Sequence, residues 1–211
     1  MKQVRPYPAS SVTLKAQRSV ESGHPWIYDT EVVQPPVCED GDLVDVFGPK
    51  GAYLGTGFYN SRSKIRVRLI SRNANDRFDE AFFERRLRHA WEYRKTVMGD
   101  DVSCCRLIFG EADSFPGLTV DRFGPILVAQ TLSLGIEKRE DLLFPLLCRI
   151  LREDGQDIAG VYERNDVAIR ELEVFYNVRL FERMNRRVYL TEAGRTLRQY
   201  ADTVLSQFQE S

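Results

Sequence analysis

Cationic and apolar side chains alternate strictly through residues 64–69, and Ile70 follows. On an extended strand the cations of this segment share one face: they are Lys64, Arg66 and Arg68. Successive cations are then about 6.6 to 7 Å apart, close to the phosphate repeat of a nucleic-acid strand. Arg62 and Arg72 extend the row at its two ends. The pattern predicts a phosphate-binding surface; the alternative is a solvated face paired with acidic neighbours.

Three carboxylates in the middle of the chain, Glu111, Asp113 and Asp121, suggest a second kind of chemistry. Two carboxylates that share a pocket can acquire the different pKa values that acid–base catalysis requires. However, Asp113 stands just before Pro116 and Gly117, and Asp in such a sequence usually satisfies backbone donors in a turn. We therefore expect turn chemistry at these carboxylates and no catalytic residue.

The sequence has few residues that could support metal or thiol chemistry. The four cysteines form no CxxC pair and have no His at ligand spacing: they are Cys38, Cys104, Cys105 and Cys148. The two histidines, His24 and His89, are too few for a His-rich metal site. We expect reduced thiols and no metal.

The glycines at positions 51, 55 and 57 do not fit a phosphate-binding loop. Such a loop lies between a strand and a helix, whereas residues 58–63 lead into another strand. Gly55 and Gly57 instead indicate a bulge, or a close approach of two backbones, within a strand.

The elements that position these residues differ between the start and the middle of the chain. Residues 1–73 are β-rich, with short apolar segments at 42–47 and 52–55 separated by the turn sequence at 48–51. We expect a small β-barrel over this region.

The middle of the chain mixes helix and strand patterns. Apolar residues recur at helical spacing over residues 79–97, with Asp79 as a suitable N-cap. Residues 106–130 indicate two strands around a turn, and a helix near 139–152 and a strand at 158–162 follow. The order predicts a compact β-β-α-β unit, so the fold class is α+β.

The composition is that of a globular protein, with 43% hydrophobic and 29% charged residues in 211. No apolar run approaches the roughly 18 residues that a membrane span needs, and the first residues lead into polar ones rather than a signal-peptide core. We therefore expect a cytoplasmic protein with no membrane contact.

The net charge of −1 conceals a partition along the chain. Residues 1–73 carry 10 basic and 7 acidic groups, a net of +3, and residues 174–211 carry 6 and 4, a net of +2. The middle, residues 74–173, carries 14 and 20, a net of −6. Both ends would favour a polyanion, and the middle would not.

Several long stretches resemble cytoplasmic 23S rRNA methyltransferases that modify cytosine at carbon 5 and begin with a PUA domain and a small α/β insert. The stretches in the first half are Gly23-His24-Pro25-Trp26-Ile27-Tyr28, residues 51–60 and residues 63–68. Those further on are residues 106–113, residues 115–121 and Tyr162-Glu163-Arg164-Asn165-Asp166-Val167. The resemblance covers residues 1 to about 173. One departure is Ser114, where the family more often has Gly.

In that family the PUA barrel helps to hold structured RNA, and a downstream Rossmann-like domain binds S-adenosylmethionine and supplies the attacking cysteine. This sequence has no Gly-rich loop between a strand and a helix, no Asp-Pro-Pro motif and no cysteine in the family's Phe-Ser-Cys context. The resemblance thus implies an RNA-binding fragment that lacks the catalytic domain and its cofactor site. An alternative is a methyltransferase that is active only with a separate catalytic domain.

Beyond Glu173 a second resemblance begins. Residues 169–183 and 186–194 resemble the DNA-binding domain of LysR-type transcription regulators. Both families contain a string similar to Ile-Arg-Glu-Leu-Glu, which suggests a join at residues 169–173, either a gene fusion or an assembly artefact.

The second resemblance implies a partial winged helix. A wing hairpin is expected at residues 179–190, with phosphate contacts at its tip from Asn185, Arg186 and Arg187. Residues 191–209 place apolar side chains three and four positions apart, typical of an amphipathic helix. This helix needs a partner: a second copy, giving a homodimer, or the insert domain. Base-specific DNA binding should be lost, because the start of the recognition helix is missing.

The sequence therefore predicts three parts: a PUA-like RNA-binding barrel over residues 1–73, an α/β insert domain over 74–173 and a LysR-type winged-helix remnant over 174–211. The expected partner is structured RNA, in particular rRNA, bound by Arg62, Lys64, Arg66, Arg68 and Arg72. The competing function is a DNA-binding fragment of a transcription regulator.

Overall fold

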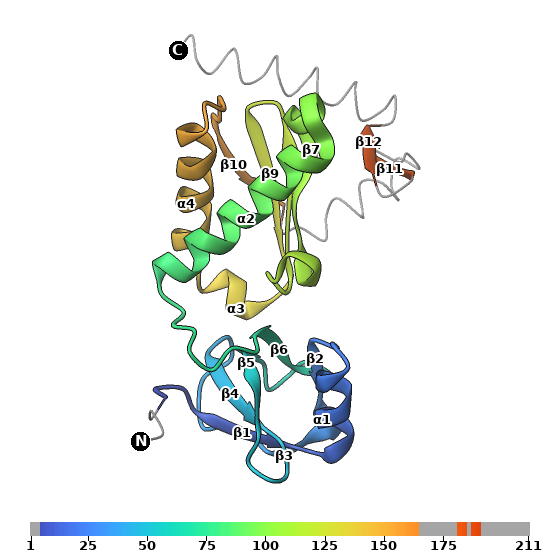
Figure 1. The fold of residues 1–211 in the computed structure, drawn as a ribbon, viewed down its shortest axis with the longest axis vertical. Coiled ribbons are helices and arrows are strands. Elements are labelled where there is room, and N and C mark those ends of the chain that lie inside the picture. Colours follow the sequence, from blue (N-terminus) through green and yellow to red (C-terminus); the bar gives the residue numbers. More distant parts are fainter. Residues whose placement is uncertain (1–4, 165–180, 185–186, 191–211) are drawn as a thin grey trace.

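The computed structural model describes residues 5–164, 181–184 and 187–190. Figure 1 shows two bodies stacked along the long axis of the molecule. We call the first, which comprises β1 to β6 and α1, the N-terminal barrel, and the second, which comprises β7 to β10 and α2 to α4, the central domain.

The N-terminal barrel is a six-stranded sheet. Its strands are β1 (Ala9–Val12), β2 (Trp26–Tyr28), β3 (Val32–Gln34), β4 (Leu43–Phe47), β5 (Tyr53–Tyr59) and β6 (Ile65–Ser71). The order is β2-β6-β5-β4-β1-β3, and only β1 and β4 are parallel. The edge strands β2 and β3 are joined by the short 3-10 helix η1 (Asp29–Glu31), so the sheet must curl until its edges approach each other. The curled sheet confirms the β-rich prediction for this region.

One helix in the N-terminal barrel was not predicted. Helix α1 (Leu14–Glu21) begins after Thr13, whose side chain accepts a hydrogen bond from the backbone N–H of Ala16. Only Ala16 and Val20 are buried on it, so its apolar stripe has just two members and gives a weak signal in the sequence.

The two glycines of β5 allow the neighbouring strand to approach closely. A Cβ atom on Gly57 would lie 2.4 Å from the carbonyl oxygen of Arg68, and Gly55 has φ +155°. The strand register also shifts between Thr56 and Gly57. The predicted bulge or close approach is therefore confirmed.

The central domain is a four-stranded sheet in the order β10-β9-β8-β7. Its strands are β7 (Cys104–Phe109), β8 (Leu118–Phe123), β9 (Ile126–Thr131) and β10 (Gly160–Glu163), and its short 3-10 helices are η2 (Gly99–Ser103) and η3 (Gly110–Asp113). Strands β9 and β10 are parallel, while the other pairs are antiparallel.

The predicted β-β-α-β order was wrong by one strand. Residues 106–130 contain parts of three strands, because Gly124 and Pro125 form a two-residue turn between β8 and β9. Gly124 has φ +60°, as expected for glycine at the first position of a hairpin turn. The short helix α3 (Leu134–Glu137) was also not predicted.

Two helices pack on one face of the central sheet (Figure 1). Helix α2 (Glu80–Met98) begins where predicted, since the Asp79 carboxylate accepts the N–H of Phe82 at 3.0 Å. Helix α4 (Glu140–Glu153) lies beside it. Side chains from both helices and from the sheet form one buried cluster, which includes Phe83, Leu87, Trp91, Val120, Leu127, Leu147 and Ile150.

This cluster extends across the junction into the N-terminal barrel. Leu43, Phe58 and Ile70 come from the barrel but belong to the core of the central domain. Ile70 lies on the strand face opposite Leu69, which packs inside the barrel. The junction therefore buries apolar surface from both bodies, which stabilises their relative placement.

The C-terminal strands β11 (Phe181–Met184) and β12 (Arg187–Leu190) pair antiparallel. Both strands lie within residues 179–190, where the wing hairpin was predicted; the wing itself stays a prediction. The predicted tip, Asn185 and Arg186, and the predicted helix at 191–209 lie outside the described residues. Among the helices of the described residues, none combines the length and apolar character needed to cross a bilayer.

Candidate nucleic-acid interface

The predicted alternation along β6 is present around Val67, Arg68 and Leu69 and is interrupted at Ile65, which lies outside the barrel core and lines the junction hollow with Arg68, where the register with β2 shifts. Val67 and Leu69 are 0% and 7% exposed and pack inside the barrel. Arg66 and Arg68 are on the opposite face and are half-buried, and Lys64, just before the strand, is exposed. Strand geometry thus places the central cations of the predicted surface on the outside of the barrel.

Arg68 is engaged with the central domain. Its Nη1 atom lies 3.1 Å from the Oε1 atom of Glu111, and its guanidinium lies 5.3 Å from the centre of the Trp26 ring. The same carboxylate oxygen accepts the indole N–H of Trp26 at 2.7 Å. At Arg68 the alternative, a cation paired with an acidic neighbour, is therefore the one observed.

Arg62 and Arg66 lie near one carboxylate of the barrel, Asp40. Asp40 accepts the backbone N–H of Ser61 at 2.6 Å and its hydroxyl at 3.0 Å. The backbone hydrogen bond from Ser61 is the largest cause that lowers the pKa of Asp40, and the charges of Arg62 and Arg66 add to it. Asp40 is thus held as an anion and offsets part of the nearby positive charge.

The outer members of the predicted row are the available ones. Arg62, Lys64 and Arg72 are exposed, and none of them forms an ion pair within the described part of the chain. Arg66 donates from Nη1 to the backbone carbonyl of Asn60 at 3.3 Å, which leaves most of its donors available. The structure therefore brings the five residues to one strand and its ends, and among carboxylates of the described residues only Glu111 forms an ion pair with one of them, Arg68.

Aromatic side chains lie beside the cations. They were not among the residues predicted from the sequence to bind RNA. Strand β2 pairs with β6 so that Trp26 is opposite Arg68 and Ile27 is opposite Val67. Ile27 is fully buried, so its neighbours Trp26 and Tyr28 are on the outer face. His24, Trp26 and Tyr28 occur at every second position, and this alternation of aromatic rings was the signal available in the sequence.

The three carboxylates considered for acid–base chemistry are not brought together. Asp113 accepts the N–H of Phe109 at 2.7 Å and pairs with Arg94, which confirms turn chemistry there. Glu111 and Asp121 differ from the expectation because they bind side chains far along the chain. Glu111 bridges to the barrel, and Asp121 pairs with Arg106 on the neighbouring strand at 2.7 Å.

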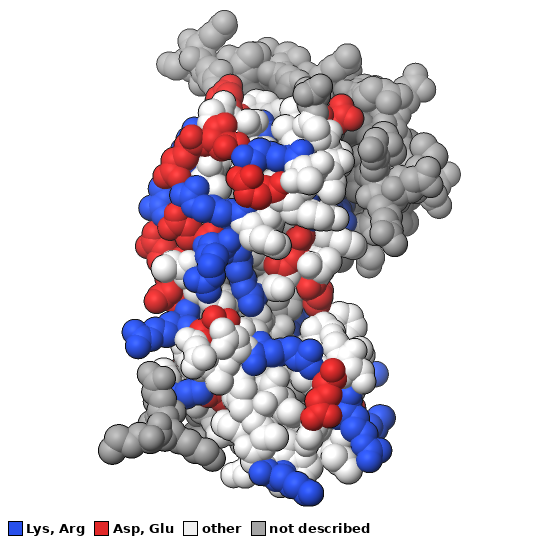
Figure 2. Space-filling model, in the orientation of Figure 1, with Lys and Arg blue, Asp and Glu red and all other residues white. Residues whose placement is uncertain are grey.

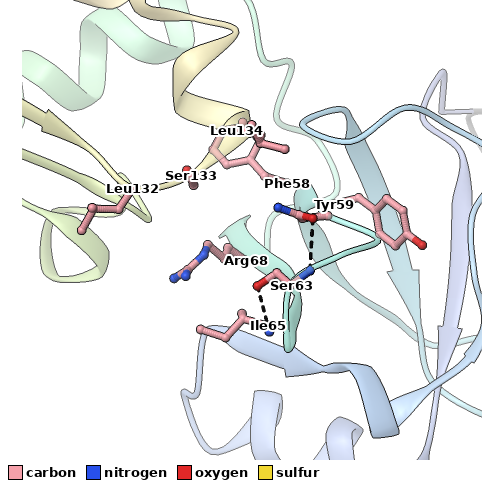
Figure 3. Close-up of a pocket in the computed structure, with 10 residues that line it drawn as sticks. Phe58, Tyr59, Ser63, Ile65, Arg68, Leu132, Ser133 and Leu134 are labelled. Carbon is pink, nitrogen blue, oxygen red and sulfur yellow. Dashed lines mark hydrogen bonds between the residues drawn. The ribbon is translucent and has the colours of Figure 1, made fainter. Parts of the chain in front are cut away.

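A small hollow lies at the junction of the two bodies (Figure 3). Its lining comes from β5, β6 and the turn between them, and from the end of the β9–α3 connection with the start of α3: Phe58, Tyr59, Asn60, Ser63, Ile65, Arg68, Leu132, Ser133, Leu134 and Gly135. Its volume is about 40 Å³. Pockets for drug-sized ligands measure roughly 300 to 1,000 Å³, so this hollow holds a few water molecules and no nucleoside.

Charges on the helices of the central domain are largely paired with one another. Arg88 binds Glu84 at 2.7 Å, and Arg149 binds Glu80 at 3.0 Å. In Figure 2 the Lys and Arg side chains on this face occur in separate groups with Asp and Glu between them. The helix surface is therefore less attractive to a polyanion than the outer cations of the barrel are.

The four cysteines, all within the described residues, form no disulfide. Burial raises the pKa of the Cys105 thiol to about 11, so it is protonated and a poor nucleophile at neutral pH. Within residues 5–164 and the two C-terminal strands, no group of three or more potential metal ligands gathers.

Of the predicted DNA contacts, Asn185 and Arg186 lie outside the described residues, and Arg187 is the first residue of β12. These contacts stay predictions.

Comparisons with known proteins agree with this architecture. Residues 11–72 match the family model of the PUA-like domain. The chain is 35% identical over 159 residues to "Ribosomal RNA large subunit methyltransferase I" of Klebsiella pneumoniae, which is 74% of this chain and 38% of that protein. The Escherichia coli protein of the same name is also 35% identical over 159 residues, covering 39% of its length. The chain thus spans about two fifths of the curated relatives that it matches.

Two solved structures resemble the fold. One, described as a SAM-dependent methyltransferase from Streptococcus mutans, has a TM-score of 0.61 at 19% identity, over 74% of this chain and 40% of the other. The other, a methyltransferase complexed with SAH, has a TM-score of 0.62 at 19% identity over the same shares. At this identity the likeness shows the fold alone. The chain therefore has an α+β fold with an N-terminal PUA-like domain, and it is similar over 159 residues to large-subunit rRNA methyltransferases.

Proposed function

We propose that this chain is the RNA-binding N-terminal part of an S-adenosylmethionine-dependent methyltransferase that acts on cytosine carbon 5 of 23S rRNA in the cytoplasm. In this proposal residues 1–73 hold structured RNA and residues 74–173 form an insert domain. The observation that carries it is the outward row of cations along β6 of a PUA-like domain.

The row suits a sugar-phosphate backbone for two reasons. Cations at alternate positions of a strand repeat at about 6.6 to 7 Å, which permits contacts with successive phosphates. Arg62, Lys64 and Arg72 are also exposed, so their donors can reach a ligand at little desolvation cost. The proposed RNA contacts are Arg62, Lys64, Arg66, Arg68 and Arg72, with Arg68 bound to Glu111 in the free protein.

S-adenosylmethionine is the methyl donor that this proposal implies, and the described residues do not fit it. The hollow at the junction has a volume of about 40 Å³, and Arg68, one of the polar side chains that line it, is bound to Glu111. We therefore assign no methyl-transfer step to these residues. Calorimetry of this chain with S-adenosylmethionine should give no heat, and micromolar binding would favour the alternative of an enzyme completed by a separate catalytic domain.

Salt-dependent RNA binding tests the proposal. The affinity of the chain for folded 23S rRNA fragments should fall with salt, and the triple variant Arg62→Ala, Lys64→Ala, Arg66→Ala should weaken binding. The slope of log K against log salt should decrease by about 2 to 3 if each cation contacts one phosphate. Arg68 is left intact because its replacement would also break the ion pair with Glu111.

A matched control uses exposed lysines of the same barrel outside the row. Lys15 on α1 and Lys50 in the turn before β5 are exposed, and replacing both with Ala should leave the salt slope of the native protein unchanged. Equal slopes for the native protein and the triple variant would reject the cation row as the RNA-binding surface.

The antiparallel pairing of β11 and β12 supports a second candidate function for residues 174–211, that of a LysR-type winged-helix remnant. In it Asn185, Arg186 and Arg187 contact DNA phosphates, and residues 191–209 mediate a homodimer. Retention of promoter DNA in the presence of competitor DNA would favour this function. If competitor DNA displaces labelled DNA equally well whatever its sequence, this function is contradicted. Sedimentation velocity tests the homodimer.

A further inference from the structure

We infer that His24, Trp26 and Tyr28 form a binding site for an unpaired nucleobase of the RNA. We call these three residues the aromatic cluster. The inference rests on the proposed function, because it specifies which part of an RNA the barrel recognises: a base that is free to stack, next to a backbone that the cations hold.

In the aromatic cluster the ring of His24 contacts the rings of both Trp26 and Tyr28 on the outer face of the barrel. The rings of His24 and Trp26 meet edge to face, with centroids 5.7 Å apart and planes at 85°. The rings of His24 and Tyr28 have centroids 6.1 Å apart and planes at 40°. Tyr28 is 37% exposed and His24 is exposed as well, so ring surface is open to a ligand.

The aromatic cluster is held in place before any ligand arrives. Ile27, between Trp26 and Tyr28, is fully buried in the barrel and fixes the strand from below. The indole N–H of Trp26 is bound to Glu111, and the His24 ring contacts the backbone of Trp26 at 3.2 Å. Rings that are already ordered lose little conformational entropy when a base stacks on them.

Cations flank the aromatic cluster on the neighbouring strand. Tyr28 is opposite Ile65 in the register of β2 and β6, and the N–H of Asp29 donates to the carbonyl oxygen of Lys64 at 2.9 Å. Exposed Lys64 is therefore next to exposed Tyr28, while Arg68 lies over the Trp26 ring. Aromatic rings beside Lys and Arg are the combination by which proteins stack bases and hold their phosphates.

This combination favours an unpaired base over a duplex or a peptide. In a double helix the base faces are covered by their neighbours, so only a loop, bulge or single strand can offer one to a ring. A proline-rich peptide also docks on aromatic rings, but it has no negative charge to bind Lys64 and Arg66.

The experiment compares two RNAs of equal length and charge, a hairpin with an unpaired loop and a closed duplex. Tyr28→Ala should weaken binding of the hairpin about five- to a hundredfold, the range for loss of one stacked base, and leave duplex binding unchanged. Tyr28→Phe keeps the ring and should bind the hairpin as the native protein does. Thermal unfolding of both variants checks that the barrel is intact.

Tryptophan fluorescence provides an independent readout. Of the two tryptophans in the chain, Trp91 is 2% exposed, so Trp26 is the one within reach of a ligand. The hairpin should quench the native protein more than the duplex does, and Trp26→Phe should remove that difference.

The outcomes separate this inference from the proposed function. If the Lys64 and Arg66 variants weaken binding of both RNAs while Tyr28→Ala changes neither, the base site is wrong and the cation row stands. If a folded Tyr28→Ala protein binds the hairpin and the duplex more weakly by the same factor, the base site is also wrong. Binding of a proline-rich peptide that Tyr28→Ala abolishes, with no preference for the hairpin, would replace RNA by a peptide as the occupant. If native protein binds neither RNA, the proposed function itself fails.

Discussion

The carboxylate of Glu111 accepts the indole N–H of Trp26 at 2.7 Å, which joins the central domain to the edge strand of the barrel. The same oxygen lies 3.1 Å from Arg68. One side chain from η3 therefore orients both an aromatic ring and a cation of the candidate RNA-binding surface. Because Glu111 and Trp26 are 85 positions apart, this arrangement depends on how the two bodies dock.

Removal of this carboxylate should loosen the junction. Glu111→Ala leaves the indole N–H and the Arg68 guanidinium without their acceptor, and we expect a loss of about 1 to 2 kcal/mol in the free energy of unfolding. The side chains of Arg68 and Glu111 are 20% and 28% exposed, so solvent screening limits the ion-pair part. Urea unfolding measures the loss, and Glu111→Gln, which can still accept from Trp26, should lose less. Equal stability of Glu111→Ala and the native protein would contradict the bridge.

The contact between Gly135 and Phe58 should be intolerant of a single added methyl group. A Cβ atom on Gly135 would lie 2.0 Å from Cγ of Phe58, whose ring is buried in the junction. Gly135→Ala should therefore destabilise the protein by about 1 to 3 kcal/mol, although Ala favours helices over Gly. Urea denaturation checks this value.

Gly160 gives a matched control for the Gly135 substitution, because an added Cβ there would meet nothing within 4 Å. Gly160→Ala should leave stability nearly unchanged. In the double variant Gly135→Ala, Phe58→Ala, the new methyl group enters the space of the lost ring, so the two losses should not add. Additive losses would show that the two residues are not in contact.

Ser114 has φ +62°, and among the described residues it is the only one other than glycine with a positive φ. An L-residue in this region costs roughly 1 to 2 kcal/mol, while glycine adds about 0.4 to 1 kcal/mol of entropy to the unfolded chain. Ser114→Gly should therefore raise the free energy of unfolding by about 0.5 to 1 kcal/mol, measured by urea denaturation. Ser103→Gly, at a residue of ordinary φ, should lower stability instead. If Ser114→Gly is less stable than the native protein, the backbone at Ser114 is not strained.

The ion pair between Asp42 and Lys138 should make the junction sensitive to acid. Its atoms are 3.0 Å apart, and the hydrogen bond from Lys138 is the largest cause that lowers the pKa of Asp42 below 3.8. A lowered carboxyl pKa means that the stabilisation is present above pH 3.8 and is lost as the pH falls through the folded-state pKa. Both side chains are 40% exposed, so the effect is a few tenths of a kcal/mol, up to about 1.

The measurement for this ion pair is the difference in melting temperature between the native protein and Asp42→Asn. The difference should be larger at pH 6 than at pH 2.5, and high salt should reduce it at pH 6. A difference that does not change with pH would show that Asp42 acts only through its uncharged hydrogen bond to the N–H of Glu39.

Local features of this protein could be predicted from the sequence because they depend on a few neighbouring residues. The alternation at residues 66–69 requires only the two-residue period of a strand, and the start of α2 requires only a capping side chain at Asp79. Helix α1 and the turn at Gly124 were missed because their patterns are short: two buried apolar residues in one case and a Gly-Pro pair in the other.

The sequence alone thus determined which residues form the outward cation row, since strand geometry separates them from Val67 and Leu69 over one segment. The tertiary structure alone decided that Arg68 is bound to Glu111, 43 positions away, and that Ile70 is buried under the central domain. It also set the aromatic cluster against the cations, because β2 and β6 pair although Trp26 and Arg68 are far apart in the sequence. The physical reason is that the direction of a side chain is a local property, whereas its partners depend on which surfaces meet when the two bodies pack.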